Sequence, residues 1–294
     1  MNSVVGLQKI LICSDLDRTI IPNGYQEESA HARPVFRHIT EHANIHLTYV
    51  SGRDKQLIID AIEEFYLPLP DYAIGDVGTT FYRIINGNWQ LSDEWSDEIS
   101  QDWKGLNWEG LAEYFEDMHE IRLQELEKQS PHKLSFYTDQ DVDHPHLKEK
   151  IRLVLMQKGL RANIIWSVDE ISSNGLLDIV PARANKLHAI QFLMKQEQFS
   201  EDNTVFAGDS GNDLDVLTSG LKAILVKNAM DEVRKEAVEK LSDKHMLNRL
   251  YLPIGNFLGL NGNYAAGVLE GLVHFFPETK KIVDDAMEQV KGSR

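Results

Sequence analysis

The chain has 294 residues, 42% of them hydrophobic and 26% charged, which is typical of a globular protein with room for one large domain and a smaller inserted one. Its formal net charge of −16 argues against a nucleic-acid partner, because a phosphate backbone requires a basic surface. The single cysteine, Cys13, excludes an intramolecular disulfide, and we expect a buried structural thiol in a reducing cytoplasm.

Strands and helices alternate over the first 75 residues. In chain order the patterns are strand-like at 9–14, helix-like at 31–43, strand-like at 45–50, helix-like at 54–66 and strand-like at 72–74. The first strand is apolar and leads directly into an acidic cluster, as a buried parallel strand that delivers its loop to a site would. This alternation predicts a doubly wound α/β domain.

The pattern changes after residue 81. Asn86-Gly87 lies between strand-like segments at 81–85 and 89–91 and predicts a hairpin. Helical stretches around 108–127, a strand at 133–138, a helix at 147–158 and a strand at 163–167 are expected next. We therefore predict an inserted α+β domain at 82–170, with the core formed by 1–81 and 171–294.

The α/β alternation resumes in the last third of the chain. We expect a strand at 176–180, a helix at 185–196, a strand at 204–207, a helix from Asp213, a strand at 223–226, a helix at 231–241 and a last apolar helix at 264–276 that closes the chain. The predicted fold is α/β: a doubly wound Rossmann-like core with a smaller inserted α+β domain.

An acidic motif, Asp15-Leu16-Asp17-Arg18-Thr19, follows the first strand at its carboxyl end, where open α/β sheets bind ligands. On an extended chain Asp15 and Asp17 point the same way, because side chains alternate with a period of two. Such a pair suits a hard cation, or a nucleophile beside a general acid/base. A solvated acidic turn that caps a helix is the alternative.

Two other turns offer groups for an anion. Ser51-Gly52-Arg53 presents a hydroxyl and backbone amides after the second strand, although Ser51 as a helix N-cap explains the motif equally well. Lys186 lies near the start of a predicted helix, where its charge opposes the helix dipole unless an anion is close. Most lysines in such positions are simply on the surface.

The segment Gly208-Asp209-Ser210-Gly211-Asn212-Asp213 follows another predicted strand. Its glycines allow a tight turn of the backbone, and its oxygen-bearing side chains converge there. Ordinary loops are also rich in Gly, Asp, Ser and Asn. Acidic loops at the ends of two separate strands, however, are what a magnesium site shared by carboxylates and a substrate phosphate requires.

Taken in this order, the four motifs resemble those of the haloacid dehalogenase-like (HAD) phosphatase superfamily. The resemblance implies that Asp15 attacks phosphorus and forms an aspartyl phosphate, and that Asp17 is the general acid/base. It implies Mg²⁺ as the cofactor, with Asp15, Asp17 (through its backbone carbonyl), Asp209 and Asp213 as the metal site. The residues implied to bind phosphate are Thr19, Ser51, Gly52, Lys186 and Asn212.

The inserted segment resembles the C2-type caps of this superfamily, and the whole chain is most similar to sucrose-phosphatases and related sugar-phosphate phosphatases. The resemblance is carried by the segments 14–19 (SDLDRT), 77–79 (VGT), 133–137 (KLSFY), 177–181 (LDIVP) and 262–275 (GNYAAGVLEGLVHF). It implies a small sugar phosphate as the substrate, sucrose 6-phosphate or a related glycosyl phosphate. Arg18 departs from the pattern, since sucrose-phosphatases commonly carry Asn there.

Three weaker features have two interpretations each. His144-Pro145-His146 is expected to form a turn rather than a metal pair. The five tryptophans, which gather in or near the inserted segment, are expected in its core rather than on a sugar-stacking surface. Lys133 and Tyr137 lie on one face of a predicted strand, where they contact a sugar hydroxyl or line the wet side of the sheet.

Two other functions share some of these residues. A phosphohexomutase would have the same core, but no dedicated phosphosugar clamp is visible in the sequence. A non-catalytic partner of a sugar-phosphate synthase would be expected to lack one of Asp15, Asp17, Lys186 or Asp209, and none is missing. The first twelve residues do not resemble a signal peptide, and no apolar stretch is long enough to cross a bilayer, so we expect a cytoplasmic protein without a membrane partner.

Overall fold

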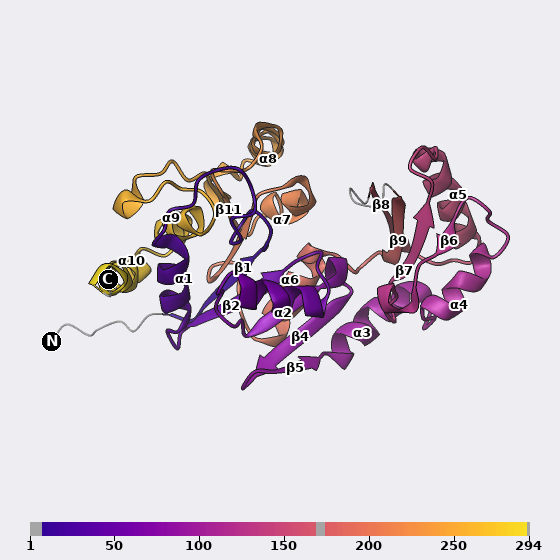
Figure 1. Cartoon of the computed structure of the whole chain (residues 1–294), viewed down its shortest axis with the longest axis horizontal. Coiled ribbons are helices and arrows are strands. Elements are labelled where there is room, and N and C mark those ends of the chain that lie inside the picture. Colours follow the sequence, from indigo (N-terminus) through magenta and orange to yellow (C-terminus); the bar gives the residue numbers. More distant parts are fainter. Residues whose placement is uncertain (1–7, 169–173, 293–294) are drawn as a thin grey trace.

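The computed structural model describes residues 8–168 and 174–292. Figure 1 shows two lobes, a larger one that holds β1 and α10, the first and last described elements, and a smaller one built around β6 to β9. Within the described residues the larger lobe has a sheet in the order β12-β11-β10-β1-β2-β3-β4-β5. The first six of these strands run parallel, and β4 and β5 are antiparallel additions at one edge.

The strands of this sheet are short. In sheet order they are β12 (Leu250–Tyr251), β11 (Lys222–Leu225), β10 (Thr204–Gly208), β1 (Ile10–Ser14), β2 (Ile45–Val50), β3 (Tyr72–Gly75), β4 (Thr80–Ile85) and β5 (Asn88–Leu91). β1 lies between β10 and β2, so the chain is wound in both directions from its first strand. The predicted doubly wound α/β core is confirmed.

Side chains of β1 enter two separate apolar clusters, which explains why its first four residues, Ile10 to Cys13, are all apolar. Ile10 and Ile12 pack on one face of the sheet, and Leu11 and Cys13 on the other. The first face is covered by α1 (Ala32–Thr40), α2 (Lys55–Glu64), α9 (Ala265–Phe275) and α10 (Lys280–Gly292). The second face is covered by α3 (Asp93–Ser100), α6 (Lys186–Gln196), α7 (Leu214–Leu217) and α8 (Asp231–Asp243).

The smaller lobe has its own antiparallel sheet and its own core. The sheet order is β6-β7-β9-β8, with β6 (Arg122–Leu123), β7 (Leu134–Thr138), β8 (Ala162–Val168) and β9 (Gly175–Pro181). Helices α4 (Trp108–Ala112) and α5 (His144–Gln157) accompany it. A third apolar cluster, which includes Trp103, Phe136 and Ile151, is contained within this lobe.

Two predicted segments belong to the other sheet. The hairpin β4–β5 was assigned to the insertion, but β4 pairs with β3, with Thr80 opposite Gly75, so it extends the larger sheet. Segment 176–180 was assigned to the core, but β9 pairs with β7 and β8 in the smaller sheet. Pairing partners decide sheet membership, and alternation along one strand does not reveal them. The predicted boundary at 170–171 lies outside the described residues, and the division into domains stays a prediction.

Other local differences follow from weak patterns. The stretch predicted as helical at 108–127 contains the short α4 and a single 3₁₀ turn, Glu113–Phe115, before β6, and α3 was not predicted. The helix at 264–276 is not the last, because α10 follows it. The predicted turn at His144-Pro145-His146 is the first turn of α5, which Asp143 caps by accepting a hydrogen bond from the His146 amide.

The tryptophans divide between the lobes. Trp103 is buried in the smaller lobe, and Trp108 and Trp166 pack against its cluster. Trp95 is buried in one apolar cluster of the larger lobe, and Trp89 packs against the other cluster of that lobe. The prediction that all five belong to the core of the insertion was wrong for these two. Within the described residues, no helix combines the length and the apolar character that a membrane span needs.

Candidate active site

The carboxyl ends of β1, β2 and β10 bring the predicted motifs to one edge of the larger sheet. Asp15 directly follows β1, and its amide donates a hydrogen bond to the carbonyl of Ala207 in β10 (2.9 Å). Asp209 directly follows β10, and Ser51 directly follows β2. Since β1 pairs in parallel with both neighbours, the three turns lie side by side.

Lys186 joins two of these turns through a buried ion network. Its Nζ lies 2.8 Å from Asp15 Oδ1 and 2.7 Å from Asp213 Oδ1, and its side chain is only 8% exposed. Burial lowers the pKa of Lys186, but the charges of the two carboxylates outweigh burial and raise this pKa above its usual value. The predicted surface alternative for Lys186 is therefore wrong: the lysine is charged, buried and paired.

Three carboxylates converge beside this lysine. Oxygen atoms of Asp15, Asp209 and Asp213 all lie within 4.8 Å of one another. Burial and the charge of Asp213 raise the pKa of Asp15 to about 7 against the pull of Lys186, and they raise the pKa of Asp209 to about 6. Clustered oxygen-only donors are what a hard divalent cation binds, so these residues fit a cation such as Mg²⁺.

Asp213 has a second, structural part in this cluster. Its Oδ2 accepts hydrogen bonds from the amides of Asp209 (3.1 Å) and Ser210 (3.2 Å) and from the Ser210 hydroxyl (3.2 Å). Gly208 is required beside it, because a Cβ there would lie 2.6 Å from Asp213 Oδ2. Both oxygens of Asp213 thus already have donors, and the residue holds the 208–213 turn and Lys186 in place.

Asp17 does not join the carboxylate cluster. β1 ends at Ser14, so side-chain alternation does not extend to Asp17, whose carboxylate points to Arg53 instead. Arg53 Nε and Nη2 donate to the two Asp17 oxygens at 2.8 and 2.7 Å, and the Asn23 side-chain amide donates at 2.7 Å. Burial raises the pKa of Asp17, but Arg53 and Asn23 outweigh burial and lower this pKa below its usual value. Sequence reasoning named Ser51 and Gly52 but gave no role to the arginine that follows them.

The other predicted phosphate ligands surround the same edge. Thr19 is buried and donates to Asp209 Oδ1 at 3.4 Å, and Ser51 is buried at the end of β2. Gly52 and Asn212 are exposed, and Asn212 accepts a hydrogen bond from Ser210 (2.6 Å). Thr19 therefore contacts the cluster, Ser51 lies at the end of the neighbouring strand β2, and Asn212 is exposed to solvent.

Arg18, the departure from the family pattern, also lies at this edge. Its Nε is 3.4 Å from Asp209 Oδ2. Its backbone has a positive φ of 57°, and its amide donates to the Asn23 side chain (2.8 Å). The charge of Arg18 opposes the rise in the pKa of Asp209, so this guanidinium is part of the electrostatics of the cluster.

The smaller lobe reaches the same side of the sheet. Lys133 Nζ lies 2.7 Å from Asp76 Oδ1, in the turn after β3, and Tyr137 donates to Glu125 (2.8 Å). A cavity of about 230 Å³ lies between the lobes, lined by Gly52, Asp54, Leu57, Asp76, Gln124, Lys128, Lys133, Ser135, Tyr137, Leu176 and Asp178. Gly52 of the predicted phosphate set and both predicted cap residues therefore share one cavity. No sequence signal pointed to Asp76.

The model of one protein family, described as sucrose-6F-phosphate phosphohydrolase, matches residues 8–276. The chain belongs to this family. The HAD-like assignment made from the motifs is confirmed, and the family is one of phosphoric monoester hydrolases, here with the acidic cluster that HAD-like phosphatases use to bind a divalent metal.

Individual relatives agree with the family. A protein of Nitrosococcus oceani described as a HAD-like hydrolase is 55% identical, over 96% of this chain and 76% of its own length. An Arabidopsis thaliana protein described as a sucrose-phosphatase is 28% identical over 94% of this chain, which spans only 61% of that protein. Mannosylfructose-phosphate phosphatase of Agrobacterium fabrum is 28% identical over 90% of this chain and 96% of its own length.

The fold also matches that of a solved family member. The sucrose-phosphatase of Synechocystis sp. PCC6803, solved in complex with sucrose and phosphate, superimposes with a TM-score of 0.65. The match covers 92% of this chain and 98% of that chain, at 24% identity. At this identity the match supports the two-lobed HAD-like architecture and carries no conclusion about the ligand.

Proposed function

We propose that this chain is a Mg²⁺-dependent phosphatase of a sugar phosphate that works through an aspartyl phosphate on Asp15. The observation that carries the proposal is the buried cluster in which Lys186 lies between Asp15 and Asp213 beside Asp209. Phosphoryl transfer depends on positioning and on neutralising charge, and this cluster provides a carboxylate nucleophile, a fixed cation and a metal site together.

In the first half of the reaction, an Asp15 oxygen attacks phosphorus and the bond from phosphorus to the sugar oxygen breaks. Asp17 gives its proton to that leaving oxygen. The phosphoryl oxygens are held by Lys186, Thr19, Ser51 and the amide of Gly52. Asn212, which is exposed in the 208–213 turn, is the remaining phosphate ligand proposed. The Lys186 charge, 2.8 Å from Asp15, also keeps the nucleophile oriented before attack.

In the second half, Asp17 takes a proton from a water whose oxygen attacks phosphorus, and the bond to Asp15 breaks to release phosphate. Asp17 is held as a carboxylate by Arg53, which is the protonation state that this step needs. Proton donation in the first half requires Asp17 to leave Arg53 and to be protonated, so Arg53 favours the base form.

Mg²⁺ would be held by carboxylate oxygens of Asp15 and Asp209 and the backbone carbonyl of Asp17, with Asp213 supporting the turn. The ion supplies positive charge to the phosphoryl oxygens during transfer. Burial first, and the charge of Asp213 in addition, raise the pKa of Asp15 and Asp209, and a bound cation would oppose both effects.

The substrate proposed is a fructose-containing disaccharide phosphate, with sucrose 6-phosphate first. Sucrose and mannosylfructose, which appear in the names of two relatives, are both fructose-containing disaccharides, and the second relative is matched over nearly its whole length. The inter-lobe cavity supports a role for Lys133 and Tyr137 in contacting sugar hydroxyls, since its lining is rich in charged and polar groups.

The alternatives are a phosphohexomutase and a non-catalytic partner of a sugar-phosphate synthase. Incubation with Mg²⁺ and a panel of sugar phosphates, with phosphate and sugar products both measured, separates the three. A hydrolase releases phosphate, a mutase returns an isomeric sugar phosphate, and a non-catalytic protein does neither. Release of phosphate from no member of the panel would refute the proposal; association with a synthase and a cytoplasmic location stay predictions.

A further inference from the structure

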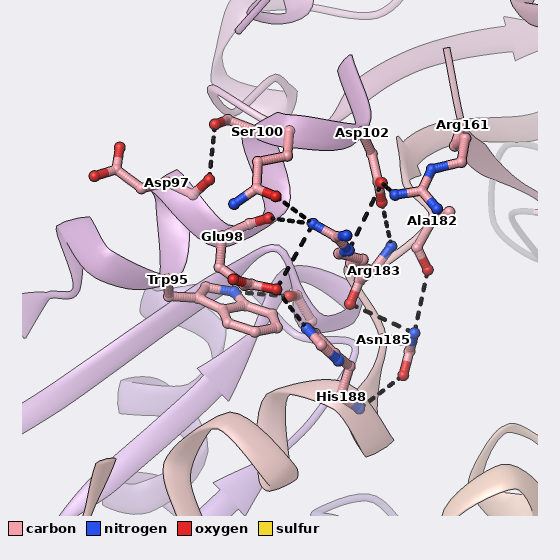
Figure 2. A network of polar contacts seen from close by, with 12 residues as sticks. Trp95, Asp97, Glu98, Ser100, Asp102, Arg161, Ala182, Arg183, Asn185 and His188 are labelled. Carbon is pink, nitrogen blue, oxygen red and sulfur yellow. Dashed lines mark hydrogen bonds and ion pairs between the residues drawn. The ribbon is translucent and has the colours of Figure 1, made fainter. Parts of the chain in front are cut away.

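The chain passes between the two lobes at two places that lie together. It leaves the larger lobe through α3 and the short turn Gln101–Trp103, and it returns between β9 and α6 through residues 182–185. Figure 1 shows α3 at the junction of the lobes. Figure 2 shows that polar side chains of the outgoing connection bind the returning one directly.

Asp102 in the outgoing connection is the centre of these contacts. Its side chain is fully buried, and its Oδ2 accepts a hydrogen bond from the backbone amide of Arg183 at 2.7 Å. Its Oδ1 accepts a hydrogen bond from the Arg161 guanidinium, and its carbonyl accepts one from the Arg161 amide (3.0 Å). One buried carboxylate therefore ties the returning connection to the outgoing one and to the smaller lobe.

The side chain of Arg183 adds a second attachment. It donates to the Gln101 side chain (2.7 Å) and to the carbonyl of Glu98 near the end of α3 (3.4 Å). The Glu98 carboxylate lies 3.2 Å from His188 Nε2, on the first turns of α6. The backbone of the return segment and the helix that follows it are thus both fastened to the outgoing connection (Figure 2).

Arg183 is only three positions before Lys186 in the sequence. Asn185 caps α6 by accepting the His188 amide (2.9 Å), and its own side-chain amide donates to the carbonyl of Ala182 (3.2 Å). On the other side the Asn185 backbone rests on Gly78, where a Cβ would approach within 2.9 Å. Lys186 is the first residue of α6, so its starting point is set from both sides.

From this geometry we infer that Asp102 is a positioning residue for Lys186: by holding the Arg183 amide it fixes the start of α6, and so places the lysine ammonium against Asp15. The inference rests on the proposed function of Lys186 in phosphate binding. Two simultaneous contacts of 2.7 and 2.8 Å leave the lysine little freedom. A misplacement of about 1 Å at a reacting centre can cost roughly 100-fold in rate.

The test uses Asp102→Ala and Asp102→Asn in the full chain, assayed well below their unfolding midpoints. The kcat of Asp102→Ala is expected to fall about 10- to 100-fold for the best sugar phosphate and equally for p-nitrophenyl phosphate, because Lys186 contacts the phosphoryl group of both. Asp102→Asn keeps an acceptor for the Arg183 amide and is expected to lie between Asp102→Ala and the native chain. Loss with the sugar phosphate alone would overturn the inference, since it would mean that Asp102 orients the smaller lobe.

The binding of inorganic phosphate in the presence of Mg²⁺, measured by calorimetry, tests the placement of the Lys186 ammonium without catalysis. The dissociation constant is expected to rise about 10-fold in Asp102→Ala. In a Lys186→Met background the same substitution is expected to change it less than 2-fold, since there is then no ammonium to misplace. Equal effects in both backgrounds would overturn the inference. If the native chain hydrolyses no phosphate ester, the proposed function fails, while this cycle still tests the placement of Lys186.

Two further variants separate positioning from general destabilisation. Asp71 also accepts a backbone amide, that of Leu47 at 2.8 Å, but it lies before β3 at the far end of the sheet. Asp71→Asn is expected to lower the unfolding midpoint without changing kcat, and an equal loss of kcat there would refute a specific role for Asp102. If the Asp102 variants do not fold, Arg161→Gln replaces them, because the Arg161 side chain pairs with Asp102 but is 62% exposed. A 2- to 5-fold loss of kcat is expected for Arg161→Gln, and an unchanged kcat would refute the inference.

Discussion

Replacing Lys186 by Met removes the ammonium between Asp15 and Asp213 but keeps most of the side-chain volume. Both carboxylates are buried, so the substitution leaves two charges close together without their cation. Removing one partner of a buried ion pair typically costs about 3–5 kcal/mol of unfolding free energy. For a chain of this size that corresponds to a fall of roughly 6–20 °C in Tm.

The cost depends on pH, and its sign follows from the pKa of Asp15. That pKa is already raised to about 7 by burial, and loss of Lys186 raises it further. A carboxyl group whose pKa is higher in the folded than in the unfolded protein binds more protons in the folded state between these two pKa values. The free energy of unfolding therefore falls as the pH rises from about 4, the unfolded pKa, through the folded pKa. Lys186→Met is therefore expected to be destabilised more at pH 8 than at pH 5, where Asp15 is protonated.

Urea unfolding in EDTA at pH 5 and pH 8, repeated with excess Mg²⁺, measures these differences. Mg²⁺ is expected to restore part of the stability at pH 8, because it neutralises Asp15 and Asp209. Lys235→Met is the control, since Lys235 is 78% exposed and pairs only loosely with Glu239 at 3.9 Å; a change below about 0.5 kcal/mol is expected there. A Lys186→Met protein as stable as the native one at pH 8 in EDTA would refute the reasoning.

Four further predictions concern activity. Asp15→Asn is expected to abolish turnover in a folded protein, checked by phosphate release and circular dichroism; near-normal activity would exclude a covalent role. Asp17→Asn is expected to slow both halves of the reaction by about 10²–10⁴-fold, while Mg²⁺ affinity, titrated by calorimetry, changes much less than in Asp209→Ala. Equal losses of Mg²⁺ affinity in these two variants would contradict that division of roles. EDTA is expected to abolish activity, Mg²⁺ to restore it and Ca²⁺ to inhibit, because the larger ion prefers more ligands in looser geometry; full activity in EDTA would overturn this. Lys133→Ala with Tyr137→Ala is expected to lower kcat/KM for the best sugar phosphate far more than for p-nitrophenyl phosphate, and equal losses would assign these residues to the stability of the smaller lobe.

Most of the chemistry-bearing turns could be found in the sequence because each follows a buried strand. Asp15, Ser51 and Asp209 directly follow β1, β2 and β10, and parallel strands place such residues at one edge. The direction of the Asp17 side chain could not be found in the same way. It depends on where β1 ends and on Arg53, a residue 36 positions away whose guanidinium competes for the carboxylate.

The sequence by itself determined the α/β rhythm, the four motifs and the family, since these depend on local periodicity and on residue types at short spacing. The tertiary structure alone decided sheet membership, because β4–β5 joins the larger sheet through hydrogen bonds to β3 and β9 joins the smaller sheet through hydrogen bonds to β7 and β8. The tertiary structure alone also decided which residues position Lys186. The carboxylates of Asp15 and Asp213, and the Asp102 contact that fastens the start of α6, come from segments that meet only in the folded chain. Long-range electrostatics and burial set these contacts, and neither quantity is encoded in the spacing of residues along one segment.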